Sequence, residues 1–133
     1  MKSEWNAQLI KTLVEERIRN IDTIFTFDNY GVSGHPNHSA ISRALSQLDS
    51  IPVLHLKSFP LWLKYLGPIG AMLLSFIFKN RIIFHVSVSE AIRSGRAAMY
   101  EHRSQMIWFR HLFVIFSIYM YINIYCENKQ RQA

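Results

Sequence analysis

Residues 22–38 read DTIFTFDNYGVSGHPNH, and they contain the clearest signals of secondary structure in the chain. After Asp22 it continues with five β-branched or aromatic residues, a composition typical of a buried strand. The polar residues 28–37, with two glycines and a proline, predict a loop. A helix is predicted from about residue 38 to 49, because its apolar residues recur on one face. After Pro52, residues 53–58 predict a second strand.

The flanking sequence extends this alternation of helices and strands. Residues 4–20 have helical apolar spacing, with Ser3 as the expected N-cap, and residues 82–88 predict a third strand. Ser89 is expected to cap a helix from Glu90 to about Arg110. The pattern indicates an α/β fold with a parallel sheet and flanking helices. The chain begins on a helix, and a parallel sheet of only two or three strands is unusual because both of its faces must be covered by other elements. We therefore expect an incomplete domain whose N-terminal half is absent.

Charge and composition divide the 133 residues, a length suited to one domain, into two parts. Residues 1–60, the α/β part with the histidine loop, contain six basic and six acidic residues, whereas residues 61–133 contain nine and three. The second part is also the more apolar, which favours an anionic membrane surface as partner. Its charges are not grouped in a nucleic-acid-binding motif, so we expect no nucleic-acid partner. A single cysteine, Cys126, excludes a disulfide framework.

Two apolar runs, 61–78 and 112–126, are candidates for membrane contact. A spanning helix needs roughly 20 apolar residues. Lys64 and the Gly67-Pro68 pair interrupt the first run, and the second has only fifteen uncharged residues, so interfacial attachment is expected. For the second run, packing against absent parts of the protein is the alternative. Four arginines between the runs recur at helical spacing and are read either as a solvated face or as contacts to phosphate or lipid headgroups: Arg93, Arg96, Arg103 and Arg110.

His35 and His38 flank a Pro-Asn pair where the loop meets the predicted helix. Ligands of open α/β sheets gather outside the carboxyl ends of the strands, where this loop is expected to lie. Imidazole is a common zinc ligand, and a helix N-terminus favours its neutral form. From the residues alone, the alternative is that these polar side chains only organise a turn. His55 and His85, inside strand-like runs, are read as ordinary core or edge residues.

The string TFDNYGVSGHPNH at 26–38, followed by HRSQMIWFR at 102–110, closely resembles the N-acetylglucosaminyl-phosphatidylinositol de-N-acetylases, which are eukaryotic members of the LmbE-like zinc deacetylase superfamily. The resemblance extends from about Trp5 to Asn123. It implies a Rossmann-like fold and hydrolysis of the acetamide of N-acetylglucosaminyl-phosphatidylinositol in glycosylphosphatidylinositol-anchor synthesis. It also implies a location on the cytoplasmic face of the endoplasmic reticulum membrane.

The same resemblance implies roles for single residues. His38 would be a zinc ligand, and His35 would bind the oxyanion or protonate the leaving amine. Asp28 would orient a site histidine, or would simply cap the loop. His102 and Gln105 match the second motif and would line or brace the site.

One expected motif is missing from the sequence. The superfamily takes two further zinc ligands and its aspartate base from an Ala-His-Pro-Asp-Asp-Glu string, which these 133 residues do not contain. Because a catalytic zinc needs three protein ligands and an open position, we expect a truncated form that is inactive by itself. The alternative is a non-catalytic, membrane-associated pseudoenzyme or partner subunit of the same fold.

Overall fold

The structure is a computed structural model that describes residues 5–127, apart from the side chain of Gln105. The described chain forms two compact units. Unit 1 comprises the residues up to Ser58 together with Tyr125–Glu127, and unit 2 comprises Phe59–Ile124.

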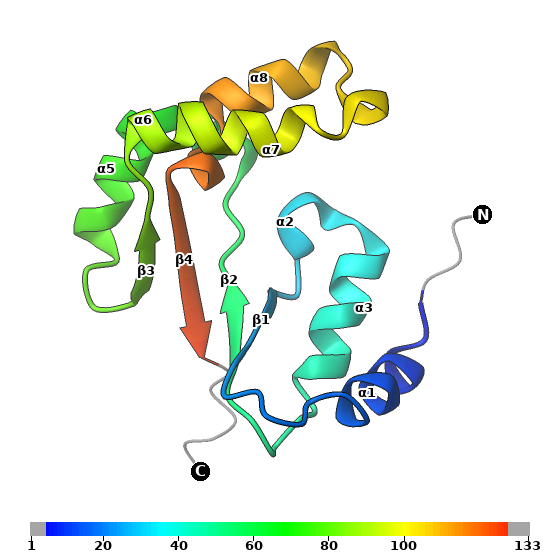
Figure 1. The fold of residues 1–133 in the computed structure, drawn as a ribbon. Helices are drawn as coiled ribbons and strands as arrows, with labels where there is room; N and C mark the ends of the chain where they lie inside the picture. The colour runs from blue at the N-terminus through cyan, green and yellow to red at the C-terminus, as the bar shows by residue number, and fades with distance from the viewer. Residues whose placement is uncertain (1–4, 128–133) are drawn as a thin grey trace. The chain divides into compact units, whose positions relative to one another are not determined.

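Unit 1 alternates helices and strands (Figure 1). Asn6 begins the first helix, because its Oδ1 accepts the backbone N–H groups of Gln8 and Leu9 at 2.9 and 3.2 Å. The expected N-cap, Ser3, lies outside the described residues. In chain order the elements are α1 (Ala7–Glu15), β1 (Ile24–Phe27), α2 (Gly31–Gly34), α3 (Pro36–Leu45), β2 (Val53–Leu56) and the last residues of β4 (Ile122–Glu127).

The sheet is mixed. β1 pairs in parallel with β2, with Ile24 opposite Val53, whereas β4 runs antiparallel to β2, with His55 opposite Cys126. The order of hydrogen-bonded neighbours is β1-β2-β4-β3. The predicted α/β class with flanking helices is confirmed, and the fold is consistent with an incomplete Rossmann-like domain. The sheet is not all-parallel as expected, because β4 runs antiparallel to β2.

The core of unit 1 holds α3 against β1 and α1. Leu45, Leu48 and Val53 are buried there, and three partly buried residues pack around them: Val14, Ile24 and Ile41. Because α3 is packed along its length, its first turn is held at the carboxyl end of β1.

Unit 2 is built mainly from short helices around an apolar core. Its buried residues include Ala71, Leu74, Ile118 and Ile122. In chain order the elements are α4 (Leu61–Lys64), α5 (Gly67–Ile77), β3 (Ile82–His85), α6 (Val88–Glu90), the π-helical η1 (Ala91–Gly95), α7 (Arg96–Tyr100), the 3-10 turn η2 (Arg103–Gln105), α8 (Trp108–Phe116), the 3-10 turn η3 (Ile118–Met120) and the first residues of β4.

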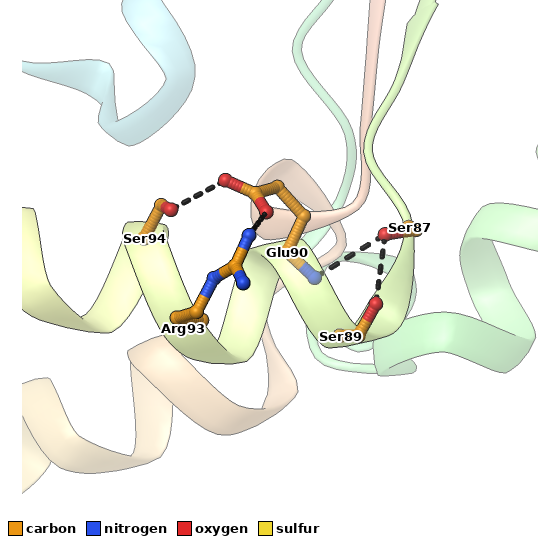
Figure 2. Close-up of polar contacts among 5 residues, drawn as sticks. All are labelled: Ser87, Ser89, Glu90, Arg93 and Ser94. Atoms are coloured by element: carbon orange, nitrogen blue, oxygen red, sulfur yellow. Dashed lines mark hydrogen bonds and ion pairs between the residues drawn. The ribbon is translucent and has the colours of Figure 1, made fainter.

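The predicted helix from Glu90 to Arg110 is wrong at both ends. Ser87, not Ser89, is its N-cap: Ser87 Oγ accepts the N–H of Glu90 at 3.2 Å, and Ser89 Oγ lies 3.1 Å from Ser87 Oγ (Figure 2). The helical stretch ends at Tyr100, and α8 begins only after η2. The sequence has no proline or glycine between α7 and α8, so the apolar spacing predicted one continuous helix where the structure has two.

The two apolar runs, 61–78 and 112–126, form different secondary structure. The predicted break in the first is confirmed, because α4 ends at Lys64 and α5 begins at Gly67, with Pro68 in its first turn. The expectation that 112–126 forms one interfacial segment is wrong for its second half. That half is β4, in which Ile122 and Ile124 are fully buried by strand alternation. No helix within residues 5–127 combines the length and the apolar character needed to cross a bilayer.

Candidate functional site

Asp28 organises the loop at the carboxyl end of β1. Its carboxylate accepts four hydrogen bonds: Oδ1 from the backbone N–H groups of Tyr30 and Gly31 at 3.1 and 3.0 Å and from Ser58 Oγ at 2.5 Å, and Oδ2 from the Ser58 N–H at 2.6 Å. Ser58 Oγ in turn accepts the N–H of Val32 at 2.8 Å. Asp28 therefore acts as a loop cap, one of its two expected roles, and ties the loop to the residues after β2.

The backbone of the loop adopts an uncommon conformation. Gly31, Val32 and Gly34 have φ values of 65°, 65° and 70°. Such values are accessible to glycine but strained for a β-branched valine. Strained backbone is concentrated at functional sites, where the surrounding contacts hold it in place. The conformation turns the Gly31 carbonyl toward His38, seven residues later.

His38, in the first turn of α3, has the geometry of a metal ligand. Its Nδ1 lies 2.9 Å from the Gly31 carbonyl oxygen. Because a carbonyl only accepts, Nδ1 carries the proton, and Nε2 of the neutral ring keeps its lone pair. Histidines that bind metals through Nε2 commonly donate Nδ1–H to such a carbonyl. Phe27 stacks on the ring, with centroids 4.3 Å apart and an interplanar angle of 9°.

His35 holds its proton on the opposite nitrogen. It is the N-cap of α3, and its Nδ1 accepts the N–H of Asn37 at 3.2 Å. In the neutral ring Nε2 therefore carries the proton and can donate it. The ring centroids of His35 and His38 are 5.2 Å apart. The loop thus presents an Nε2 lone pair beside an Nε2–H donor, a combination that can bind a cation and a developing negative charge.

These residues fit a metal only in part. His38 supplies one suitable donor atom, but residues 5–127 contain no cluster of three histidine, cysteine, aspartate or glutamate side chains that could hold an ion. A catalytic zinc requires three protein ligands, so the described residues do not complete such a site.

Two residues near the loop were not among the sequence-based candidates. Ser58 is one, although its position just after β2 could have indicated it, because functional side chains follow the carboxyl ends of strands. His55 is the other: it is buried, as the reading of a core residue predicted, and its Nδ1–H donates to the Phe27 carbonyl at 2.9 Å. Its Nε2 and Thr26 Oγ1 find no hydrogen-bond partner in the described part of the chain.

The remaining candidates all belong to unit 2. His102 is exposed just before η2, and Gln105 ends η2 with its side chain outside the described part. The four arginines differ in their contacts and in their burial. Arg93 pairs with Glu90 at 2.7 Å (Figure 2), and Arg96 lies 5.8 Å from the ring centroid of Tyr100. Arg103 is exposed in η2, and Arg110 is half-buried in α8.

Comparison of the sequence with known proteins identifies relatives that share one name. A probable N-acetylglucosaminyl-phosphatidylinositol de-N-acetylase of Schizosaccharomyces pombe is 33% identical over 136 residues, which cover 93% of this chain and 54% of the relative. The N-acetylglucosaminyl-phosphatidylinositol de-N-acetylase of Bos taurus is 40% identical over 110 residues, covering 77% of this chain and 43% of the relative. A probable enzyme of the same name from Dictyostelium discoideum is 26% identical over 161 residues, covering 94% and 62%.

The chain spans about half the length of the curated relatives it matches. No family model and no solved structure matches the sequence. Over most of its length, this chain belongs to the family of the N-acetylglucosaminyl-phosphatidylinositol de-N-acetylases.

Proposed function

We propose that this chain is the carboxyl-terminal part of an enzyme that removes the acetyl group from N-acetylglucosaminyl-phosphatidylinositol by hydrolysis. The observation that carries the proposal is the opposite placement of the protons on His35 and His38. A deacetylase needs a cation-binding nitrogen and a hydrogen-bond donor close together, because negative charge develops on the carbonyl oxygen during attack. The relatives' names supply the substrate and the reaction.

In this proposal the two histidines have separate tasks. His38 Nε2 would be one ligand of a catalytic zinc ion, whose other ligands would have to come from outside residues 5–127. His35 donates from Nε2–H, either to the oxyanion or to the leaving amine. Asp28 and Ser58 hold the Gly31 peptide in place, so they act as positioning residues.

The substrate named for the relatives is a glycolipid, so we also propose that the chain works at a membrane surface. The cytoplasmic face of the endoplasmic reticulum is the proposed location. The fifteen basic residues against nine acidic ones support contact with an anionic surface.

A chimera tests the proposed function. This chain replaces the matching part of the Bos taurus relative, and acetate release from N-acetylglucosaminyl-phosphatidylinositol is measured together with bound zinc. We expect an active chimera whose His38→Ala variant loses zinc and whose His35→Ala variant keeps zinc but loses turnover. His85→Ala, on the exposed strand β3, is the control and should change neither. Stoichiometric zinc in the His38→Ala variant would refute the ligand assignment.

A second candidate function is a non-catalytic pseudoenzyme or partner subunit. It is favoured by the absence of a three-ligand cluster within residues 5–127. The chimera separates the two candidates, because a non-catalytic chain would leave it without acetate release. The purified 133-residue chain, loaded with zinc, is a second test. We expect no acetate release from it. Activity that a chelator removes would show that this sequence contains a complete site.

A further inference from the structure

Helix α5 is apolar on two sides, and only one of them is buried. Gly70, Ala71 and Leu74 face the core of unit 2, with Leu74 only 2% exposed. A second stripe, at helical spacing of three and four residues, faces solvent: Ile69, Met72, Leu73, Phe76 and Ile77. Phe76 is 75% exposed. An exposed apolar stripe of this length on a globular unit marks an interaction surface.

Helix α8 repeats the pattern and lies against α5. Val114 is buried, while a second stripe faces solvent: Trp108, Phe109, Leu112, Ile115 and Phe116. Trp108 is 76% exposed. The two helices touch where α5 begins and α8 ends, because a Cβ placed on Gly67 would lie 3.7 Å from the Phe116 carbonyl oxygen. The two stripes therefore belong to adjoining elements of one unit, and we name them together the α5–α8 face.

The charge of unit 2 indicates which partner suits this face. Phe59–Ile124 contain seven basic residues and two acidic ones, so unit 2 accounts for five of the six excess positive charges of the chain. Lys64 is buried, and burial lowers its pKa, but Lys79 and Arg81 follow α5 directly and are exposed. Apolar and aromatic side chains beside exposed cations are the composition of helices that lie in the headgroup region of anionic bilayers.

We propose that the α5–α8 face is a membrane-docking surface that lies in the interface of an anionic lipid bilayer. The exposed residues of α5 and α8 enter the boundary between headgroups and acyl chains, and the neighbouring cations contact lipid phosphates. Neither helix, with eleven and nine residues, is long enough to cross the membrane. The proposal rests on the proposed function only in that a glycolipid substrate gives such docking a purpose.

The test uses the full 133-residue chain and its co-sedimentation with phosphatidylcholine vesicles, prepared with and without phosphatidylserine. We expect binding to the anionic vesicles that weakens as salt rises. The variants Phe76→Ser and Trp108→Ser should each weaken binding about tenfold. Both side chains are about three-quarters exposed, so folding, checked by circular dichroism, should persist. Leu9→Ser, an equally apolar exposed position on α1 in unit 1, is the matched control and should bind like the unaltered chain.

Three results would overturn the proposal. One is the absence of binding to either kind of vesicle, and another is equal binding by the control and the two α5–α8 variants. The third is concentration-dependent self-association that the two variants abolish while vesicle binding is absent, because a second copy of the chain would then cover the face. The readout is lipid binding, so an inactive chimera would leave this proposal intact and would contradict only the proposed function.

Discussion

Replacing Gly31 by alanine should damage the histidine loop more than the same change at Gly34. Both glycines have positive φ, at 65° and 70°, so alanine carries a similar backbone penalty at each, about 1 kcal/mol. Only their surroundings differ. A Cβ on Gly31 would lie 2.5 Å from the Cβ of His38, whereas the atoms nearest to a Cβ on Gly34 belong to the Tyr30 side chain, at 3.6 Å.

The collision sets the size of the difference. Carbon atoms in contact prefer about 3.5–4.0 Å, so the first turn of α3 must move by about 1 Å in the Gly31→Ala variant. The atoms nearest to the new methyl are the His38 Cβ and backbone atoms of His38 and Ser39, which no rotamer change can withdraw. Overpacking of this kind costs about 1–3 kcal/mol. We therefore expect a loss of about 2–4 kcal/mol for Gly31→Ala and about 1 kcal/mol for Gly34→Ala.

Two measurements check this expectation. Urea unfolding followed by circular dichroism gives the free energy of unfolding, and an unchanged m value shows that the unfolded state is comparable. Nitrogen-15 NMR of the imidazole rings reports which nitrogen of His38 carries the proton. It should report Nδ1–H in the Gly34→Ala variant and a weakened preference in Gly31→Ala, because the 2.9 Å bond to the Gly31 carbonyl is displaced. Equal losses of stability in the two variants would refute the close approach of Gly31 and His38.

Three further changes test other contacts, two in the histidine loop of unit 1 and one in unit 2. Asp28→Asn should cost about 2–3 kcal/mol in urea unfolding, because one amide oxygen cannot accept the four bonds of the carboxylate; an unchanged midpoint would contradict the capping role. Val32→Gly should stabilise by about 1 kcal/mol, since φ of 65° suits glycine, and any loss of stability would show that the valine is not strained. Hydrogen bonds from the Ser94 hydroxyl and from Arg93 lower the pKa of Glu90. The stability that these bonds contribute is therefore present above the usual pKa of glutamate and is lost as the pH falls through the lowered pKa. The melting temperature should therefore fall in Glu90→Gln at pH 7 but not in acid, and a deficit that persists in acid would contradict this.

Much of unit 1 was predictable because its signals are local. Residues 22–27 contain enough β-branched and aromatic side chains to identify β1 without any partner. The glycines and Pro36 marked the loop, and the apolar spacing after it marked α3. The observed elements differ from the predicted ones mainly at their ends, where fraying and caps decide the boundary. The predicted loop 28–37 also differs, because it contains the short turn α2 (Gly31–Gly34) and α3 begins within it at Pro36.

Strand β4 was not predictable from the same kind of signal. Residues 112–126 are uncharged throughout, so the polar alternation that identifies a half-buried strand is weak. Ile122 and Ile124 are buried and Asn123 is half-buried, a pattern that only pairing with other strands makes visible. A continuous apolar run is compatible with a buried strand, a core helix and an interfacial segment, and tertiary context decides among them.

In the candidate site, residue identity was predictable and proton placement was not. The sequence shows two histidines three residues apart, with nothing that distinguishes their ring nitrogens. Their difference comes from backbone partners: His38 donates to a carbonyl, and His35 accepts from an amide. The first of these requires positive φ at Gly31 and Val32, and no propensity scale predicts such a value for valine.

Gly31 links the carboxylate of Asp28 to the ring of His38 through its two backbone polar groups. Its N–H donates to Asp28 Oδ1 at 3.0 Å, and the carbonyl of the same residue accepts from His38 Nδ1 at 2.9 Å. Asp28 thereby fixes the orientation of the residue whose carbonyl selects the His38 tautomer, although no hydrogen bond joins Asp28 and His38 directly in the described structure. Of the two roles expected of Asp28, the structure shows the loop cap, and this cap acts on the backbone that presents Nε2 of His38 as an acceptor.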